Sequence, residues 1–146
     1  MATVENFFQR GKEFLGTKYP IMGGAMTWVS ESNLVSAISN AGGLGVLACG
    51  SMDSKKLRKE ILTTKKKTTY PFGVNLILLH PEINSLIECC ISEKVKIVVF
   101  AGGFPKKSQV EILKKNNIKS VCFATTLAIA KKMVSNGIDA LILEGN

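Results

Sequence analysis

Residues 96–123 have the sequence KIVVFAGGFPKKSQVEILKKNNIKSVCF, and this stretch decides the fold. It holds two short apolar runs, Lys96–Phe100 and Ile118–Phe123, on either side of Pro105–Asn116, whose apolar residues recur at helical spacing. Both runs are too short and too continuously apolar to be anything but buried parallel strands. The stretch therefore predicts one strand–helix–strand unit of a parallel sheet.

The same alternation of apolar runs and amphipathic stretches extends over the rest of the chain. Further strands are predicted at Tyr19–Met22, Leu44–Cys49, Phe72–Ile77 and Ala140–Leu143, and further helices at Glu31–Asn40, Ser54–Lys66, Pro81–Glu93 and Leu127–Asn136. An amphipathic helix is also predicted within the first 18 residues. Ser32 and Ser54 are the expected N-caps, and Gly42 and Gly137 are the expected helix stops.

The six predicted strands fit two architectures. Their centres follow one another at intervals of 20 to 28 residues, and such a uniform repeat favours a barrel. A complete (β/α)8 barrel has eight strands and typically needs about 250 residues, which is more than this chain supplies. An open, doubly wound sheet is the alternative, because it accommodates five or six strands in about this length.

Composition predicts a single globular domain covering residues 1–146, with 46% apolar residues and a net charge of +8. Four cysteines without CxxC spacing indicate free thiols in a reducing compartment, and hence a cytoplasmic protein. No run approaches the length of a membrane span, and no histidines accompany the cysteines to form a metal site. The lysine clusters lack interleaved aromatic residues, so nucleic acid is not an expected partner.

Glycines and isolated polar residues point to a ligand at the carboxyl ends of the strands. Gly23-Gly24 and Gly102-Gly103 follow predicted strands, where glycine either lets the backbone approach a ligand closely or only makes the tight turn into the next helix. Asn75 interrupts an apolar strand, so its amide needs a hydrogen-bond partner, which we expect to be a ligand. Glu144 is either a carboxylate at this end of the sheet or a solvated chain end. His80, the only histidine, is expected to be an exposed turn residue.

One glycine-rich motif is rejected as a dinucleotide-binding loop. Ala41-Gly42-Gly43-Leu44-Gly45 follows a predicted helix and precedes a strand. A phosphate-binding loop of the Rossmann type needs the reverse order, because the phosphates bind at the beginning of the helix.

Several longer motifs resemble one family of flavoenzymes. They are YPIMGGAMTWVS at 19–30, SNAGGLGV at 39–46, PFGVNL at 71–76, AIAKKM at 128–133 and GIDALILEG at 137–145. In this order and spacing, the chain resembles the flavin-dependent nitronate monooxygenases, formerly called 2-nitropropane dioxygenases. It is equally similar to the related flavin-dependent enoyl-acyl-carrier-protein reductases.

The resemblance implies an α/β fold, a partial (β/α)8 TIM barrel that binds FMN at the carboxyl ends of its strands and holds no metal. About six βα units are present, and the last strands are missing. The residues that the resemblance assigns to FMN are Met22, Gly23, Gly24, Ala25, Asn75 and Glu144. The usual Gln-Gly-Gly-Met motif is replaced by Gly23-Gly24-Ala25-Met26, so one side-chain amide is absent.

The resemblance also implies that the chain is an N-terminal fragment. Family members continue beyond the segment that matches Glu144 into a loop with the catalytic histidine, whose position His80 does not occupy, so no catalytic residue is assigned. Three possibilities are expected: oxidation of alkyl nitronates with O2, reduction of an enoyl thioester by NAD(P)H, or no catalysis, the chain being a degenerate remnant or one half of a split barrel. The half barrel would pair with a complementary C-terminal fragment or form a homo-oligomer. We expect the chain alone to retain FMN weakly and to be impaired or inactive.

Overall fold

The computed structural model describes residues 4–144, and its centre is a parallel β-sheet. Within these residues the sheet has five strands in the order β1-β2-β3-β4-β5, and each strand pairs in parallel with the next. The strands are β1 (Gly45–Ala48), β2 (Phe72–Ile77), β3 (Ile97–Ala101), β4 (Lys119–Ala124) and β5 (Ala140–Leu143). All five lie where apolar runs were predicted, so the repeated βα order is confirmed.

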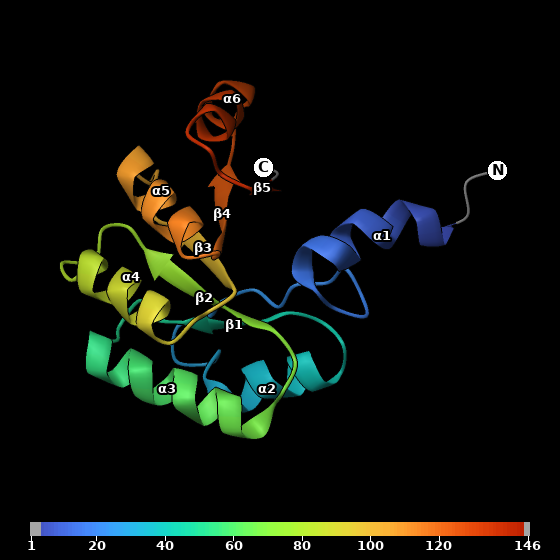
Figure 1. Ribbon diagram of the computed structural model, residues 1–146, viewed down its shortest axis with the longest axis vertical. Coiled ribbons are helices and arrows are strands. Elements are labelled where there is room, and N and C mark those ends of the chain that lie inside the picture. The colour runs from blue at the N-terminus through green and yellow to red at the C-terminus, as the bar shows by residue number, and fades with distance from the viewer. Residues whose placement is uncertain (1–3, 145–146) are drawn as a thin grey trace.

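Helices cover one face of this sheet. They are α2 (Ser32–Asn40), α3 (Ser54–Lys67), α4 (Ile83–Ser92), α5 (Lys107–Lys115) and α6 (Leu127–Ser135). A further helix, α1 (Val4–Leu15), lies apart from this layer and extends away from the sheet (Figure 1). No helix in the described part of the chain combines the length and the apolar character that a membrane span needs.

The prediction of a regular strand at Tyr19–Met22 is wrong. Only Met22 forms a bridge, to Leu44, although Leu44 N–H also donates to the Ile21 carbonyl at 2.9 Å. The segment therefore runs beside the start of β1 but makes too few ladder bonds to count as a strand. Pro20 explains part of this, because proline has no N–H to donate. The sheet consequently has five strands and one bridge instead of six strands.

Two of the predicted helix caps are also wrong, each by one residue. The N-cap of α3 is Asp53, whose Oδ1 accepts the Lys56 N–H at 2.7 Å, and Ser54 is the first helical residue. The N-cap of α2 is Glu31 in place of Ser32, with no side-chain capping bond. Asp53 is the N-cap because its carboxylate accepts a charge-assisted hydrogen bond from a backbone N–H in the first turn of the helix.

The predicted helix stops are confirmed. Gly42 follows α2 with φ +97°, and Gly137 follows α6 with φ +92°. This left-handed conformation suits glycine, which has no Cβ to clash with the preceding turn.

The sheet has a separate apolar core on each face. Between the sheet and the helices, β2 contributes Val74 and Leu76, which pack with buried side chains of the helices such as Leu57 and Leu86. The opposite face, which we call the interior face, has a smaller core of Leu44, Val46, Ile97, Val99 and Val121. Because both faces of β1, β2 and β3 are buried, these three strands are apolar apart from Asn75.

Candidate functional site

Since all five strands are parallel, their carboxyl ends meet at one end of the sheet, which we call the mouth. The end of β3 continues into Gly102 (φ +69°) and Gly103 (φ +139°), both in conformations that side chains rarely adopt. These glycines hold the backbone turn that leads out of the sheet toward α5. Their position at the mouth agrees with the sequence-based prediction.

A cavity of about 360 Å³ lies at the mouth beside these glycines. It is lined by Ala101, Gly102, Gly103, Phe104, Phe123, Thr125 and Glu144. The cavity therefore brings together the ends of β3, β4 and β5, and Glu144 and the two glycines line it together. Sequence reasoning identified Glu144 but missed the aromatic walls Phe104 and Phe123. Phe123 could have been found by counting in steps of two from Val121 along the strand.

The segment that contains Met22, Gly23, Gly24 and Ala25 is held by one buried serine. Ser30 Oγ donates to the Gly24 carbonyl at 3.1 Å and accepts the Met26 N–H at 3.0 Å. Ser30 is only 2% exposed, whereas a Cβ added at Gly24 would meet no atom within 4 Å. The backbone at Gly24 therefore faces open space, while the two hydrogen bonds of the buried Ser30 fix its position. Sequence reasoning missed Ser30, because a serine in a loop carries no distinctive signal.

Met22, Gly23 and Ala25 lie on the same segment and connect it to the sheet. Gly23 N–H donates to the Leu44 carbonyl at 2.9 Å, next to the bridge that Met22 forms. Met22 and Ala25 pack against the core of the interior face. The structure thus brings these three predicted residues together at the edge of the sheet.

Asn75 lies in the middle of β2 and is 7% exposed. Its neighbours Val74 and Leu76 pack toward the helices, so the alternation of side chains along a strand directs Asn75 toward the interior face. Its Nδ2 donates to the Val99 carbonyl at 3.3 Å. This bond uses one of the three hydrogen-bonding groups that an asparagine amide offers.

The structure does not bring Asn75 and Glu144 together. Asn75 lies on β2 and Glu144 directly follows β5, and these two strands are three strand spacings of about 4.8 Å each apart along the sheet. Any ligand that contacts both residues must therefore extend across the interior face.

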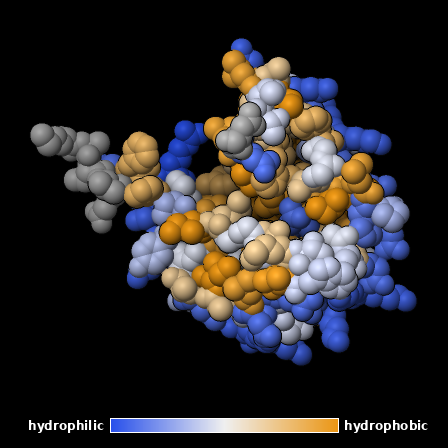
Figure 2. Space-filling view, turned by 180° about the vertical axis from the view of Figure 1, so that it is seen from behind, coloured by the Kyte–Doolittle hydropathy of each residue, from blue (hydrophilic) through white to orange (hydrophobic). Residues whose placement is uncertain are grey.

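Apolar side chains surround this face. Figure 2 shows hydrophobic side chains around a hollow on the side of the molecule that is turned away in Figure 1. Half-buried Phe14 and Leu15 of α1 pack against the core from the side where the strands begin, and Lys119 Nζ donates to the Phe14 carbonyl. The interior face is thus covered by α1 at one end and accessible at the mouth.

The four cysteines are free and buried. Cys49 follows β1, and its thiol donates to the Asn75 carbonyl at 2.8 Å. Burial raises the pKa of Cys49 from 9.0 to about 12 and also raises the pKa of Cys90. A thiol that holds its proton so tightly is a poor nucleophile. We therefore assign the cysteines a packing role and not a catalytic one.

The raised pKa of Cys49 predicts a loss of stability in alkaline solution. Above pH 9 the unfolded thiol loses its proton while the folded thiol keeps it, so the free energy of unfolding falls as the pH rises toward 12. Between pH 8 and pH 10 we expect the free energy of unfolding of the parent chain to fall by about 1 kcal/mol more than that of the Cys49→Ala variant. Urea titrations of both proteins at the two pH values measure the difference. Equal losses in the two proteins would contradict the prediction.

His80 lies in the turn between β2 and α4, as predicted, but it is half-buried. Its Nδ1 accepts the Glu82 N–H at 3.1 Å. This bond gives the ring a local structural role at the start of α4. Within residues 4–144, no cluster of three or more His, Cys, Asp or Glu side chains could hold a metal ion.

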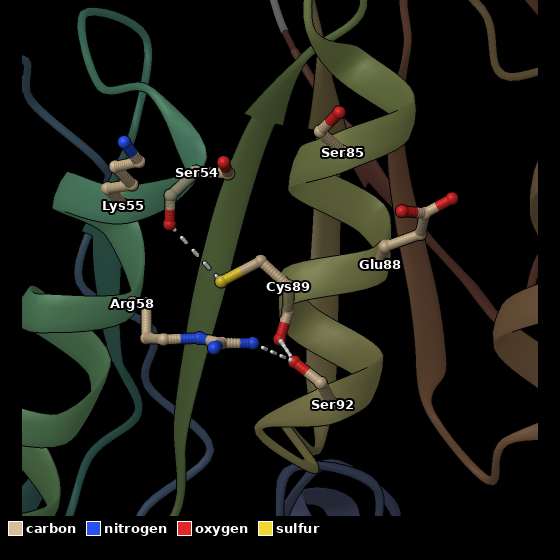
Figure 3. A pocket seen from close by; sticks show the side chains of 7 residues that line it. All are labelled: Ser54, Lys55, Arg58, Ser85, Glu88, Cys89 and Ser92. Carbon is tan, nitrogen blue, oxygen red and sulfur yellow. Dashed lines mark hydrogen bonds between the residues drawn. The ribbon is translucent and has the colours of Figure 1, made fainter.

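A second cavity, of about 480 Å³, lies between α3 and α4 on the outer layer (Figure 3). Arg58 crosses this cleft, where its Nη2 donates to Ser92 Oγ at 2.9 Å and its Nε pairs with Glu93 at 3.2 Å. The Cys89 thiol donates to the Ser54 carbonyl at 3.6 Å, and burial raises its pKa. Because the sheet separates this cleft from the interior face, it is not part of the site at the mouth.

Comparison with known proteins shows the family of this chain. The profile of the nitronate monooxygenase family matches residues 9–146. A hydroxy-methyl-oxo-octahydro-indene-carboxyl-CoA dehydrogenase of Rhodococcus jostii is 35% identical over 91% of this chain and 37% of its own length. A probable nitronate monooxygenase of Staphylococcus aureus is 27% identical over 92% of this chain and 48% of its own length.

Solved structures show the same fold. FabK from Thermotoga maritima superposes with a TM-score of 0.90 and 38% identity, over 93% of this chain and 43% of FabK. A nitroalkane oxidase from Streptomyces ansochromogenes, at 24% identity, has a TM-score of 0.84 over 92% of this chain and 48% of its own. The prediction of a partial (β/α)8 barrel is therefore confirmed. The chain spans less than half of the length of these relatives, and it belongs to the nitronate monooxygenase family of flavin-dependent oxidoreductases.

Proposed function

We propose that this chain, as the N-terminal part of a barrel domain, contributes one side of an FMN-dependent oxidoreductase site at the mouth. The observation that carries the proposal is the arrangement around Gly24. Its backbone faces open space, and a hydrogen bond from the buried Ser30 holds it in place. A flat ring can approach such a backbone closely, because no side chain intervenes.

The described residues fit a flavin ring. Met22, Gly23, Gly24 and Ala25 would lie beside it through their backbone, and Asn75 would hydrogen-bond to it with the groups that Val99 does not occupy. Glu144, beside the cavity at the mouth, would contact the far side of the ligand. When bound, FMN supplies the redox chemistry, and the protein supplies position and a water-poor apolar surface.

Two substrates are candidates for the complete site. The family profile supports oxidation of alkyl nitronates with O2, which is our first choice. The likeness to FabK and to a dehydrogenase of a carboxyl-CoA compound supports reduction of an enoyl thioester by NAD(P)H as the second. A cytoplasmic location remains a prediction from the cysteine content.

Exposed apolar residues at the β5 edge of the sheet support the proposal that another polypeptide segment completes the barrel there. Leu143 on this strand is 77% exposed, and Leu127 and Val134 on the adjacent α6 are 71% and 60% exposed. An apolar strand edge of this kind is normally paired or covered. We propose that a complementary C-terminal segment with further βα units covers it. A second copy is a weaker candidate, because each copy carries a net charge of +8.

The proposal is tested by mixing the purified chain with FMN, with and without the part of Thermotoga maritima FabK that follows the matched region. We expect the chain alone to retain little FMN through dialysis, and the mixture to quench FMN fluorescence at micromolar protein. Asn75→Ala should weaken FMN binding in the mixture about tenfold, which corresponds to one lost hydrogen bond. Asn84→Ala, an exposed site on the outer helix α4, is the matched control.

Two outcomes would count against the proposal. One is FMN binding by the mixture that is no tighter than binding by the FabK part alone. The other is an Asn75→Ala variant that folds normally and binds FMN as tightly as the parent. In a mixture that binds FMN, loss of flavin absorbance with a nitronate or with NAD(P)H distinguishes the two candidate substrates.

A further inference from the structure

The end of the sheet opposite the mouth carries a concentration of positive charge. Three segments meet there, residues 65–72, 91–97 and 114–119, where α3, α4 and α5 end and the next strands begin. Together they contain eight lysines and one acidic residue, Glu93.

Part of this charge is balanced within the fold. Lys65 Nζ pairs at 3.3 Å with the Glu93 carboxylate, which also pairs with Arg58 at 3.2 Å. Each of the three helix ends also contributes about half a negative charge. The remaining lysines exceed these negative charges, so the surface has a net attraction for anions.

Two adjoining cavities lie in this surface. The first, of about 440 Å³, has Tyr70, Pro71, Phe72 and Val95 in its lining, with lysines 65, 94 and 96. The second, of about 370 Å³, shares Lys94, Val95 and Lys96 with the first and adds Lys115, Asn116 and Asn117. Because Lys94, Val95 and Lys96 line both cavities, the two lie side by side, and we call the pair the lysine groove.

The two halves of the lysine groove differ in chemistry. The first half offers Tyr70, which is 57% exposed, beside the half-buried Pro71, whereas Val95 in its lining is only 3% exposed. The second half offers the Lys115 ammonium group and two amides, and Lys94 and Lys96 lie between the halves. Aromatic and apolar groups suit a planar ring, whereas lysine ammonium groups suit phosphates. Each cavity is within the size range of small-ligand sites.

We propose that the lysine groove binds a ligand that joins a planar ring to a phosphate chain, in the chemical class of nucleoside diphosphates and triphosphates. The ring lies against Tyr70, and the phosphates extend past Lys94 and Lys96 toward Lys115. The groove lies at the amino ends of the strands, whereas the proposed flavin site lies at the carboxyl ends. The two ligands therefore bind independently, and the proposal holds whether or not FMN binds.

Isothermal titration calorimetry of the purified chain with ADP, at low salt and again at 0.2 M salt, tests the proposal. We expect a dissociation constant below about 0.1 mM at low salt and weaker binding at high salt, because the phosphates pair with lysines. The double variant Lys94→Gln/Lys96→Gln should weaken ADP binding at least tenfold. The control, Lys131→Gln/Lys132→Gln on the exposed surface of α6, removes the same charge elsewhere and should leave binding unchanged.

A second comparison tests the ring. Tyr70→Ala should weaken the binding of ADP about fivefold and leave the binding of inorganic tripolyphosphate unchanged. Thermal unfolding of each variant checks that it folds. The proposal is overturned if the Lys94/Lys96 and Lys131/Lys132 double variants weaken ADP binding equally, since the binding would then depend on the net charge of the protein alone. It is also overturned if ADP does not bind at 1 mM, or if Tyr70→Ala leaves ADP binding unchanged.

Discussion

Replacing Gly45 with alanine is expected to destabilise the chain by at least about 3 kcal/mol, a large part of the roughly 5 to 15 kcal/mol that stabilises a domain. Gly45 begins β1, and a Cβ at this position would lie 2.2 Å from the Val35 carbonyl oxygen and 2.9 Å from the Val35 Cα. Both atoms belong to the backbone of α2, so no side-chain rotation can relieve the overlap. The helix must move away from the strand, which opens the core.

The matched control is Gly24→Ala. At Gly24 an added Cβ meets no atom within 4 Å, and no positive φ restricts the residue. Its effect on the free energy of unfolding should stay within about 0.5 kcal/mol. Urea denaturation followed by circular dichroism measures both variants. A Gly45→Ala protein as stable as the parent would show that α2 and β1 are not in close contact.

The Phe100→Ala variant is expected to lose about 3 to 5 kcal/mol of stability. Phe100 lies on β3 and is fully buried in the core between the sheet and the helices. Removing the ring loses its burial and leaves a cavity, because the surrounding elements are tied together by the sheet. Thermal and urea unfolding of the variant and the parent measure the loss.

The same substitution at an exposed phenylalanine provides the control. Phe7 on α1 is 85% exposed, so Phe7→Ala should change the stability by less than about 0.5 kcal/mol. If the two variants lost equal stability, the core between the sheet and the helices would not be the main source of stability.

The sequence was sufficient to predict the order of strands and helices because each buried strand is a continuous apolar run. Phe72–Ile77 and Ala140–Leu143 have the bounds that were predicted. The segment at Tyr19–Met22 carries the same apolar signal but forms only one bridge. Its composition could not show how many ladder bonds it makes, since these depend on its alignment with the edge of β1.

The candidate site was predictable only in part. Gly24 and Asn75 stood out because their residue types are unusual at those positions. Ser30 and Phe123 did not, because a loop serine and a strand phenylalanine are ordinary residues whose role depends on what lies nearby. Hydrogen bonds from Ser30 to a segment six residues away exist only in the folded chain.

The amino-acid sequence by itself determined the parallel α/β class and the family, since both depend on local patterns and motifs along the chain. Only the tertiary structure decided which side chains of each strand face the helices and which face the interior. The strands β1, β2 and β3 are buried on both faces, so their apolar runs carry no alternation that marks one side. The tertiary structure also decided that Gly102, Phe123 and Glu144 share one cavity, because parallel pairing brings the ends of three separate strands together.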